Sequence, residues 1–297
     1  MLKFVIYLVT PAGYDYLTAH KQKMEYALSD RDVNLLIMKA PKKYEEEIKE
    51  FCYNNSCKDD TLIISDSNDI VQTLKQQGFL TAGFYHNENR DETFYDVLYA
   101  VTDVDELNCK SYDEVYRRLR QIPWDILETD RLFVRESTVE DVTDFYRIYS
   151  DPSITKYMED LFQDPEQEIA YMQDYIKQMY GFYGFGMWTV MEKQSGEIIG
   201  RAGLSVREGY DVPELGFVIE RKHQGKGYAK EVCEAILEYA KCELCFDEVQ
   251  ALVIKENEAS LKLLQKLGFA YEKDVTEGGQ LYRLMKKKSG EGDKRGI

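Results

Sequence analysis

Hydrophobic positions in the first 120 residues fall into short apolar runs separated by amphipathic stretches. The apolar runs predict short buried strands at Lys3–Val9, Val33–Met38, Thr61–Ser65, Leu80–Tyr85 and Val97–Thr102. The stretches between them have helical spacing at Lys42–Tyr53, Asp69–Gln77 and Tyr112–Gln121. Strands that alternate with helices predict a parallel sheet covered by helices. We therefore expect residues 1–124 to form an α/β/α sandwich with a parallel sheet.

The pattern changes after the turn at Pro123–Asp125, which we expect to mark a domain boundary. The second half predicts strands at Arg131–Glu136, Met187–Met191, Ile198–Val206, Glu214–Ile219 and Asp247–Ile254. It predicts helices at Val139–Tyr149, Gln167–Tyr180, Ala229–Lys241 and Leu261–Leu267, the first of them capped by Thr138. Residues 125–288 form the second predicted domain. Residues 289–297 have no apolar pattern and are expected to be a disordered tail.

A glycine-spaced basic turn joins the strand Glu214–Ile219 to the helix that begins at Ala229. The first N–H groups of a helix have no intrahelical partner, and the helix dipole places partial positive charge there. Gly225 and Gly227 have no Cβ, so an anion can approach the main chain closely. The turn therefore predicts a binding site for a diphosphate, and hence for a nucleotide-type cofactor.

Two common nucleotide motifs are excluded by the residues of this turn. A P-loop needs a glycine where Glu220 stands and a Ser or Thr where Gly227 stands. A dinucleotide-binding turn needs three glycines, and only Gly225 and Gly227 are present. What fits is the pattern Gln/Arg-x-x-Gly-x-Gly/Ala, met by Gln224, Gly227 and Ala229.

The turn and its flanks resemble the GNAT superfamily of acetyl-CoA-dependent N-acetyltransferases. Downstream, Asn257-Glu-Ala-Ser260 followed by a leucine-striped segment and Gly268-Phe269 is similar to the family's Asn-x-x-Ser/Ala helix. Asn257 stands at a helix N-cap position and Gly268 at a helix stop. Upstream, Glu128–Glu136 looks like the first strand of the RimJ/RimL branch, the ribosomal-protein N-terminal acetyltransferases. The resemblance covers residues 127–287 and implies a GNAT fold, a mixed and mainly antiparallel sheet flanked by helices.

The resemblance implies transfer of an acetyl group from acetyl-CoA to a primary amine, by direct attack in a ternary complex. It assigns the diphosphate to Gly225, Gly227, Tyr228 and Ala229, with Gln224 and Lys226 as polar supplements. By the same resemblance the pantetheine arm pairs with the main chain of Phe217, Val218 and Ile219, as in strand addition. Asn257 and Ser260 are expected on the opposite wall, and CoA is the product.

The catalytic residue implied by the resemblance is Glu214, which would accept a proton from the acceptor ammonium. The alternative is a surface glutamate at a strand end. A family tyrosine that protonates the leaving thiolate is replaced by Leu264. This replacement keeps open a non-catalytic acyl-CoA-binding sensor or scaffold. Phe182, Tyr183 and Phe185 lie in a predicted flexible stretch, Tyr180–Gly186, and are candidate acceptor contacts.

The first half carries a weaker resemblance to haloacid-dehalogenase-like phosphatases, at Ser65-Asp66-Ser-Asn-Asp69. Such enzymes need an aspartate nucleophile at the end of their first strand, and the first acidic residue here is Asp15, beyond that strand. We therefore interpret Asp66 and Asp69 as turn and helix-cap residues. Residues 1–124 are expected to be a non-catalytic accessory domain, with a phosphohydrolase as the less favoured alternative.

Composition limits the remaining function classes. A formal net charge of −16 argues against nucleic-acid binding and is compatible with a cationic amine acceptor. No run is long enough to cross a membrane, and Met1–Val9 is interpreted as a strand before a turn at Pro11–Gly13 rather than as a leader. The pair Cys242 and Cys245 has no second pair or nearby histidine, so no metal site is expected. Scattered cysteines favour a cytoplasmic protein, and the resemblance leaves room for a homodimer.

Overall fold

The structure is a computed structural model that describes residues 1–29, 31–158 and 160–288. The chain divides into two compact units, the first Met1–Ile122 and the second from Pro123 onward. Each unit is described by itself. The predicted tail at 289–297 lies outside the described residues. No helix in the described parts is long and apolar enough to cross a membrane.

The first unit is built on a five-stranded sheet in the order β2-β1-β3-β4-β5, in which each neighbouring pair is parallel. The strands are β1 (Phe4–Val9), β2 (Asn34–Lys39), β3 (Thr61–Ser65), β4 (Leu80–Phe84) and β5 (Ala100–Val101). β1 and β3 are almost wholly buried, as expected for central strands covered on both faces. The predicted parallel α/β/α sandwich is confirmed, although the fifth strand is only two residues long.

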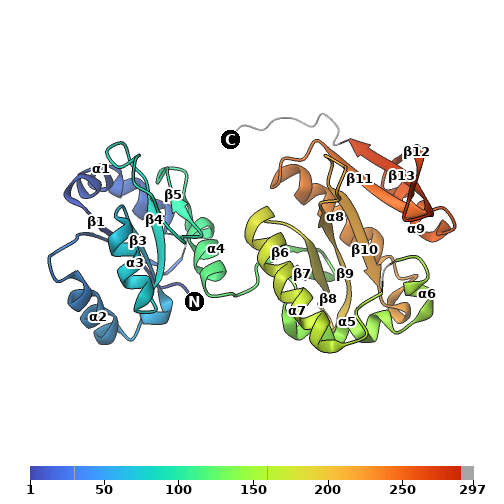
Figure 1. Ribbon diagram of the computed structural model, residues 1–297, viewed down its shortest axis with the longest axis horizontal. Helices are drawn as coiled ribbons and strands as arrows, with labels where there is room; N and C mark the ends of the chain where they lie inside the picture. The colour runs from blue at the N-terminus through green and yellow to red at the C-terminus, as the bar shows by residue number, and fades with distance from the viewer. Residues whose placement is uncertain (30, 159, 289–297) are drawn as a thin grey trace. The chain divides into compact units, whose positions relative to one another are not determined.

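Helices cover both faces of this sheet (Figure 1). α1 (Pro11–Ala27) and α4 (Cys109–Leu119) contribute to one hydrophobic cluster, and α2 (Tyr44–Asn55) and α3 (Asn68–Gln76) to another. The expected turn at Pro11–Gly13 is wrong, because Pro11 begins α1. Proline is favoured at the first helical position, where its missing N–H costs nothing, and the Thr10 side chain caps the helix by accepting from Gly13 N.

The second unit is built on an eight-stranded sheet in the order β12-β13-β11-β10-β9-β8-β7-β6. Every neighbouring pair is antiparallel except β10 with β11. Its strands are β6 (Asp125–Glu128), β7 (Leu132–Arg135), β8 (Met187–Glu192), β9 (Ile198–Ser205), β10 (Glu214–Ile219), β11 (Glu248–Ile254), β12 (Ala270–Glu277) and β13 (Gln280–Lys288). The predicted mixed, mainly antiparallel sheet is confirmed.

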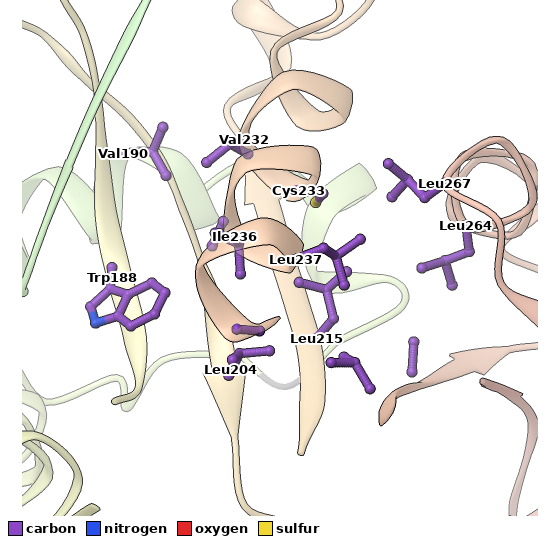
Figure 2. Close-up of a cluster of buried hydrophobic side chains, with 14 of the residues drawn as sticks. Trp188, Val190, Leu204, Leu215, Val232, Cys233, Ile236, Leu237, Leu264 and Leu267 are labelled. Atoms are coloured by element: carbon purple, nitrogen blue, oxygen red, sulfur yellow. The ribbon is translucent and has the colours of Figure 1, made fainter. Parts of the chain in front are cut away.

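Two hydrophobic clusters hold helices to this sheet. α8 (Tyr228–Cys242) and α9 (Glu258–Lys266) contribute to the larger one, where Trp188 and Leu215 of the sheet meet Ile236 and Leu264 (Figure 2). α5 (Val142–Tyr149), α6 (Pro152–Thr155) and α7 (Pro165–Tyr175) contribute to the smaller cluster, together with Ile198 and Val218. The sheet is therefore the middle layer of three.

Sequence and structure differ most after α7. The segment expected to be flexible from Tyr180 to Gly186 begins inside a π-helix, Ile176–Tyr183, which ends at Gly184 with a left-handed φ of 75°. The buried Tyr180 hydroxyl anchors this segment, because it accepts from Ser137 N at 3.1 Å and donates to Met187 O at 2.5 Å. The prediction of a loop is therefore wrong for residues 180–183, whereas residues 184–186 lie outside helices and strands as expected.

Candidate functional site

β10 and β11 touch through one residue pair and then part. Glu214 pairs with Gln250, and Gln250 N donates to Pro213 O at 2.9 Å. By contrast, β10 keeps six paired residues with β9, from Glu214 to Ile219. Within the described residues no further strand pairs with β10 on its β11 side. The edge of β10 that faces β11 is thus open beyond its first residue.

The alternation of the strand fixes which backbone groups lie on that open edge. Glu220 N donates to Ile199 O at 2.8 Å, so residues 216, 218 and 220 direct their N–H and C=O groups toward β9. The backbone groups of Phe217 and Ile219 point the other way, toward β11. Of the three predicted pantetheine contacts, Phe217 and Ile219 therefore offer main-chain groups to the gap, whereas Val218 directs its own toward β9.

The glycine turn leads directly from this strand into α8. A short 3₁₀ turn, Arg221–His223, follows β10, and the chain then passes Gly225 and Gly227, with left-handed φ values of 76° and 86°. Gly227 is the N-cap residue of α8, a helix of 15 residues. Because glycine has no side chain, the N-cap offers no side-chain acceptor to the first N–H groups of this helix. A Cβ at Gly225 would meet no atom within 4 Å, so the turn faces open space.

Arg131, which immediately precedes β7, holds this turn in place. Its Nη1 donates to Lys226 O at 3.0 Å, its Nε donates to Glu231 Oε2 at 2.7 Å, and the guanidinium lies over the Tyr228 ring. Burial raises the pKa of Glu231, but hydrogen bonds from Thr129 and Arg131 lower it by more. The pKa of Glu231 therefore lies below its usual range. Arg131 was not foreseen, because its partners lie 95 and 100 residues away along the chain.

Two predicted cofactor-binding side chains are already used inside the turn. Gln224 Nε2 donates to Ile219 O at 2.9 Å, which closes the end of β10. The Tyr228 hydroxyl donates to Glu192 on β8, and this hydrogen bond raises the pKa of Tyr228. Both side chains shape the turn. The main chain from Gly225 to Ala229 and the Lys226 side chain remain as the groups available to an anion.

The predicted base, Glu214, is buried and paired with a cation. It is 8% exposed, so the alternative of a surface glutamate is wrong. Arg207 Nη2 donates to Glu214 Oε1 at 3.1 Å and its Nε to Glu214 Oε2, while Nη1 donates to Glu277 Oε2 at 2.9 Å. The hydrogen bond to Glu214 raises the pKa of Arg207. Arg207 thus joins the loop after β9 to the start of β10, through Glu214, and to the end of β12, through Glu277.

The start of α9 follows β11, the strand on the other side of the open edge of β10. Asn257 caps this helix, accepting from Ser260 N at 3.2 Å. Leu264, which stands where the family has a tyrosine, is fully buried in the larger hydrophobic cluster (Figure 2). Its side chain therefore serves packing, and the position holds no proton donor.

The three candidate acceptor contacts have different surroundings. Phe182 is 81% exposed and Tyr183 is half exposed, and the two rings pack edge to face. Phe185 is buried and packs edge to face on Phe246. Only Phe182 and Tyr183 are accessible to another molecule, and Phe185 is a core residue.

Asp66 of the first unit lies at the carboxyl end of β3, beside the end of β1. In the strand order of this sheet the chain reverses direction between β1 and β3, where α/β proteins commonly bind ligands. Here the protein's own groups fill that position: Thr10 N and Thr10 Oγ1 donate to Asp66 at 2.8 and 2.6 Å, and His86 Nε2 lies 3.0 Å from it. Asp66 thus lies at the bend after β3, as expected, and is also a buried hydrogen-bond acceptor. Asp69 lies in the exposed first turn of α3, whose N-cap is Ser67.

Comparison with known proteins places this geometry in a family. The profile of the acetyltransferase (GNAT) domain matches residues 131–270. The chain is 31% identical over 150 residues to the uncharacterized N-acetyltransferase YoaA of Bacillus subtilis, covering 50% of this chain and 84% of that protein. It is 30% identical over 166 residues to the uncharacterized protein YkkB of the same organism, covering 55% of this chain and 95% of the other.

A solved structure with a similar fold is the ribosomal-protein-S5-alanine acetyltransferase of Vibrio fischeri. It aligns with 56% of this chain and 97% of its own length, with 17% identity and a TM-score of 0.49. The matched profile lies wholly within the second unit and spans the strand that begins at Leu132, the open edge of β10, the glycine turn and α9. The chain belongs to the GNAT family of N-acetyltransferases.

Proposed function

We propose that the protein transfers an acetyl group from acetyl-CoA to a primary amine, either a protein N-terminus or a small amine. One observation carries this proposal: the open edge of β10 runs directly into the glycine turn at the start of α8. An extended pantetheine arm needs unpaired main-chain groups, and the diphosphate next to it needs unpaired N–H groups. The two requirements are met in succession along one segment, Phe217–Ala229.

The donor would be held mainly by the backbone. Phe217 offers N–H and C=O groups to the pantetheine amides, and the N–H groups from Gly225 to Ala229 surround the diphosphate, with Lys226 adding charge. We assign Asn257 to the opposite wall, because its oxygen is engaged in the helix cap and its amide N–H₂ is available for a hydrogen bond. A main-chain N–H of β10 beside the thioester would also stabilise the oxyanion that develops on its carbonyl oxygen.

Glu214 is the residue we assign as general base. It lies where β10 and β11 part, and its carboxylate accepts hydrogen bonds from Arg207. A protonated amine passes one proton to the carboxylate, directly or through water, and its lone pair attacks the thioester carbon. The new C–N bond forms, the nitrogen loses its second proton to water, the C–S bond breaks, and CoA leaves as a thiolate. Because Leu264 is buried and the Tyr228 hydroxyl binds Glu192, we assign protonation of the thiolate to water.

The acceptor is a cationic or neutral amine. A net charge of −16 attracts cations over long range, and the accessible rings of Phe182 and Tyr183 can contact an ammonium or the apolar part beside it. The scattered positions of the six cysteines in the sequence favour a reducing compartment, the cytoplasm, as the place of action. For the first unit we propose an accessory, non-catalytic role, because the Asp66 carboxylate already accepts hydrogen bonds from Thr10 within the protein.

Calorimetric titration of the full chain with acetyl-CoA and with CoA tests donor binding. Gly225→Ala adds a methyl group where the diphosphate should lie, and we expect at least a tenfold loss of affinity. Gly209→Ala is the matched control, because Gly209 also has a left-handed φ, 82°, and no atom within 4 Å of an added Cβ. It precedes β10, at the end opposite the glycine turn. Equal losses in the two variants, or no binding to the wild type, would refute the donor site.

Release of free CoA thiol in the presence of amines separates the enzyme from a non-catalytic acyl-CoA sensor. Substrates should include polyamines and peptides that begin with Ser or Ala. We expect Glu214→Gln to lower kcat by at least a hundredfold while leaving the acetyl-CoA Kd within a factor of three. Thiol release at the wild-type rate in Glu214→Gln would remove Glu214 from the mechanism. Binding without turnover on any amine would favour the sensor.

A further inference from the structure

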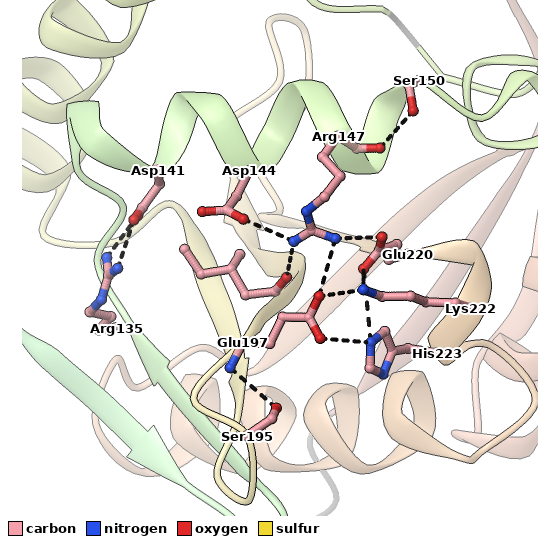
Figure 3. A network of polar contacts seen from close by, with 11 residues as sticks. Arg135, Asp141, Asp144, Arg147, Ser150, Ser195, Glu197, Glu220, Lys222 and His223 are labelled. Carbon is pink, nitrogen blue, oxygen red and sulfur yellow. Dashed lines mark hydrogen bonds and ion pairs between the residues drawn. The ribbon is translucent and has the colours of Figure 1, made fainter.

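Three potential metal ligands gather beneath the glycine turn. Glu197 immediately precedes β9, Glu220 follows β10, and His223 lies in the 3₁₀ turn that leads to Gly225. One donor atom from each of the three lies within 4.8 Å of the others (Figure 3). The cluster thus joins the turn between β8 and β9 to the segment that positions the proposed diphosphate site.

The oxygens of the two carboxylates are divided between two neighbours. Arg147 of α5 contacts Oε1 of Glu220 and lies 3.5 Å from Oε1 of Glu197. The other oxygens face the imidazole: His223 Nε2 is 3.5 Å from Glu197 Oε2 and 3.9 Å from Glu220 Oε2. Arg147 is itself held by Ile198 O at 2.7 Å and by Asp144 at 2.9 Å. It therefore orients both carboxylates with one oxygen each toward His223.

The imidazole of His223 lacks the partners that a buried polar ring requires. The residue is 6% exposed, and neither Nδ1 nor Nε2 has a hydrogen-bond partner among the described residues. Glu220 Oε2 is likewise buried without a hydrogen bond in that part of the chain. Buried polar atoms are normally satisfied, so the unsatisfied atoms of this cluster point to a bound species.

We propose that Glu197 Oε2, Glu220 Oε2 and His223 Nε2 form a binding site for a divalent transition metal ion, best matched by zinc. One imidazole nitrogen and two carboxylate oxygens suit zinc, whereas magnesium prefers oxygen ligands alone. In a tetrahedral zinc site the ligand atoms are about 3.4 Å apart, given metal–ligand bonds of about 2.1 Å. The separations of 3.5 and 3.9 Å from His223 Nε2 are close to this value, and all three donor atoms lie within 4.8 Å of one another, so the carboxylates need to approach the ion as it binds.

Lys222 competes with a metal ion for the same carboxylates. Its ammonium contacts Glu197 and lies 3.5 Å from Glu220 Oε2, and its side chain is half exposed. Zinc would balance the two carboxylate charges, so the ammonium could move into solvent when the ion binds. Arg147 would stay in place on the other oxygens, as supporting residues do around metal ligands. The ion would thereby fix the turn before Gly225 to β9.

Zinc titration of the chelator-treated full chain tests the proposal. We expect one equivalent to bind, at least tenfold weaker binding in His223→Gln and in Glu197→Gln, and at least threefold tighter binding in Lys222→Ala. The double variant Cys242→Ser/Cys245→Ser is the control, because both thiols are exposed and could bind zinc themselves. Unchanged affinity in His223→Gln, or loss of binding in the cysteine variant, would overturn the assignment.

Cobalt provides a readout that does not depend on the folding of the histidine variant. Co²⁺ bound by one nitrogen and two oxygens in a tetrahedral site gives visible absorption bands that hydrated Co²⁺ lacks. We expect these bands in the wild type, and at lower cobalt concentration in Lys222→Ala. A folded Lys222→Ala protein that binds neither zinc nor cobalt would refute the site. Gly225→Ala should leave zinc binding unchanged, which separates this site from that of the proposed donor.

Discussion

The guanidinium of Arg131 lies over the ring of Tyr228, with 4.4 Å between its Cζ atom and the ring centroid. Arg131 immediately precedes β7 and Tyr228 is the first residue of α8, so the contact joins two segments that are almost 100 residues apart in sequence. The same guanidinium binds Lys226 O and Glu231. A flat, multidentate cation is needed for all three contacts at once.

Replacing Arg131 should weaken donor binding without unfolding the second unit. We expect Arg131→Ala to lower acetyl-CoA affinity roughly tenfold, equivalent to about 1.4 kcal/mol, because the turn loses its support. Arg131→Lys should not restore affinity, since an ammonium cannot donate to Lys226 O and Glu231 in the same fork geometry. Calorimetry measures both variants. Wild-type affinity in Arg131→Lys would show that charge alone matters here.

Asp141 should make the second unit sensitive to acid. Burial raises the pKa of its carboxyl, but hydrogen bonds from Arg135, Thr138 N and Thr189 lower this pKa by more. The pKa of Asp141 in the folded state is therefore depressed. A depressed pKa contributes stability above the unfolded value of about 3.9 that is lost as pH falls through the folded value. Stability from this group should therefore decline below about pH 4.

Urea unfolding of the wild type and Asp141→Asn between pH 3 and 7 measures this contribution. Both tryptophans, Trp124 and Trp188, belong to the second unit, so their fluorescence reports on that unit. We expect Asp141→Asn to cost about 3 kcal/mol at pH 7, with a smaller difference at pH 3. A difference that is constant with pH would mean that the charge of Asp141 is not what stabilises the fold.

Leu264 should behave as a core residue rather than as a vestigial catalytic position. Leu264→Ala should reduce the free energy of unfolding by about 2–5 kcal/mol through the cavity it leaves, and Leu264→Met by less than about 1.5 kcal/mol. Leu264→Tyr should destabilise by about 1–3 kcal/mol because the site is filled, with no gain in thiol release. A rise in kcat for Leu264→Tyr would contradict the assignment of thiolate protonation to water.

Asp66 should matter for the first unit only. Asp66→Ala leaves Thr10 N, Thr10 Oγ1 and His86 without their acceptor, and we expect a loss on the order of 3 kcal/mol. Asp69→Ala is the control and should change stability by less than about 0.5 kcal/mol, since Asp69 is exposed. Circular dichroism follows the whole chain and tryptophan fluorescence the second unit. The fluorescence transition and acetyl-CoA affinity should remain those of the wild type.

The sequence was sufficient for the features that depend on local pattern. The apolar run at Thr61–Ser65, the strand Glu214–Ile219 and the glycines that begin α8 agree with the structure to within a residue. These elements are set by side-chain periodicity and by glycine conformation, which act over a few neighbouring positions. The turn expected at Pro11 is wrong because proline favours both turns and the first position of a helix, so its presence alone does not distinguish the two.

Side-chain partners across the sheet could not be predicted. The pairing of Glu214 with Arg207, the support of Lys226 by Arg131, and the gathering of Glu197 with His223 depend on how strands are ordered in space. No spacing rule links such positions. The chemistry of the glycine turn was therefore readable from the sequence, whereas the charges that surround it were not.

Among the described residues, the pair Glu214–Gln250 is the one residue pair that joins the two halves of the second sheet. Strands β6 to β10 lie on one side of it, and β11, β13 and β12 on the other. Regions held by few hydrogen bonds open at lower free energy than the rest of a domain. Backbone amides along the boundary between the halves should exchange with solvent sooner than those between β8 and β9. The two halves of the sheet are thus expected to unfold with low cooperativity across this boundary, and a molecule that pairs with the open edge of β10 would couple them into one unfolding unit.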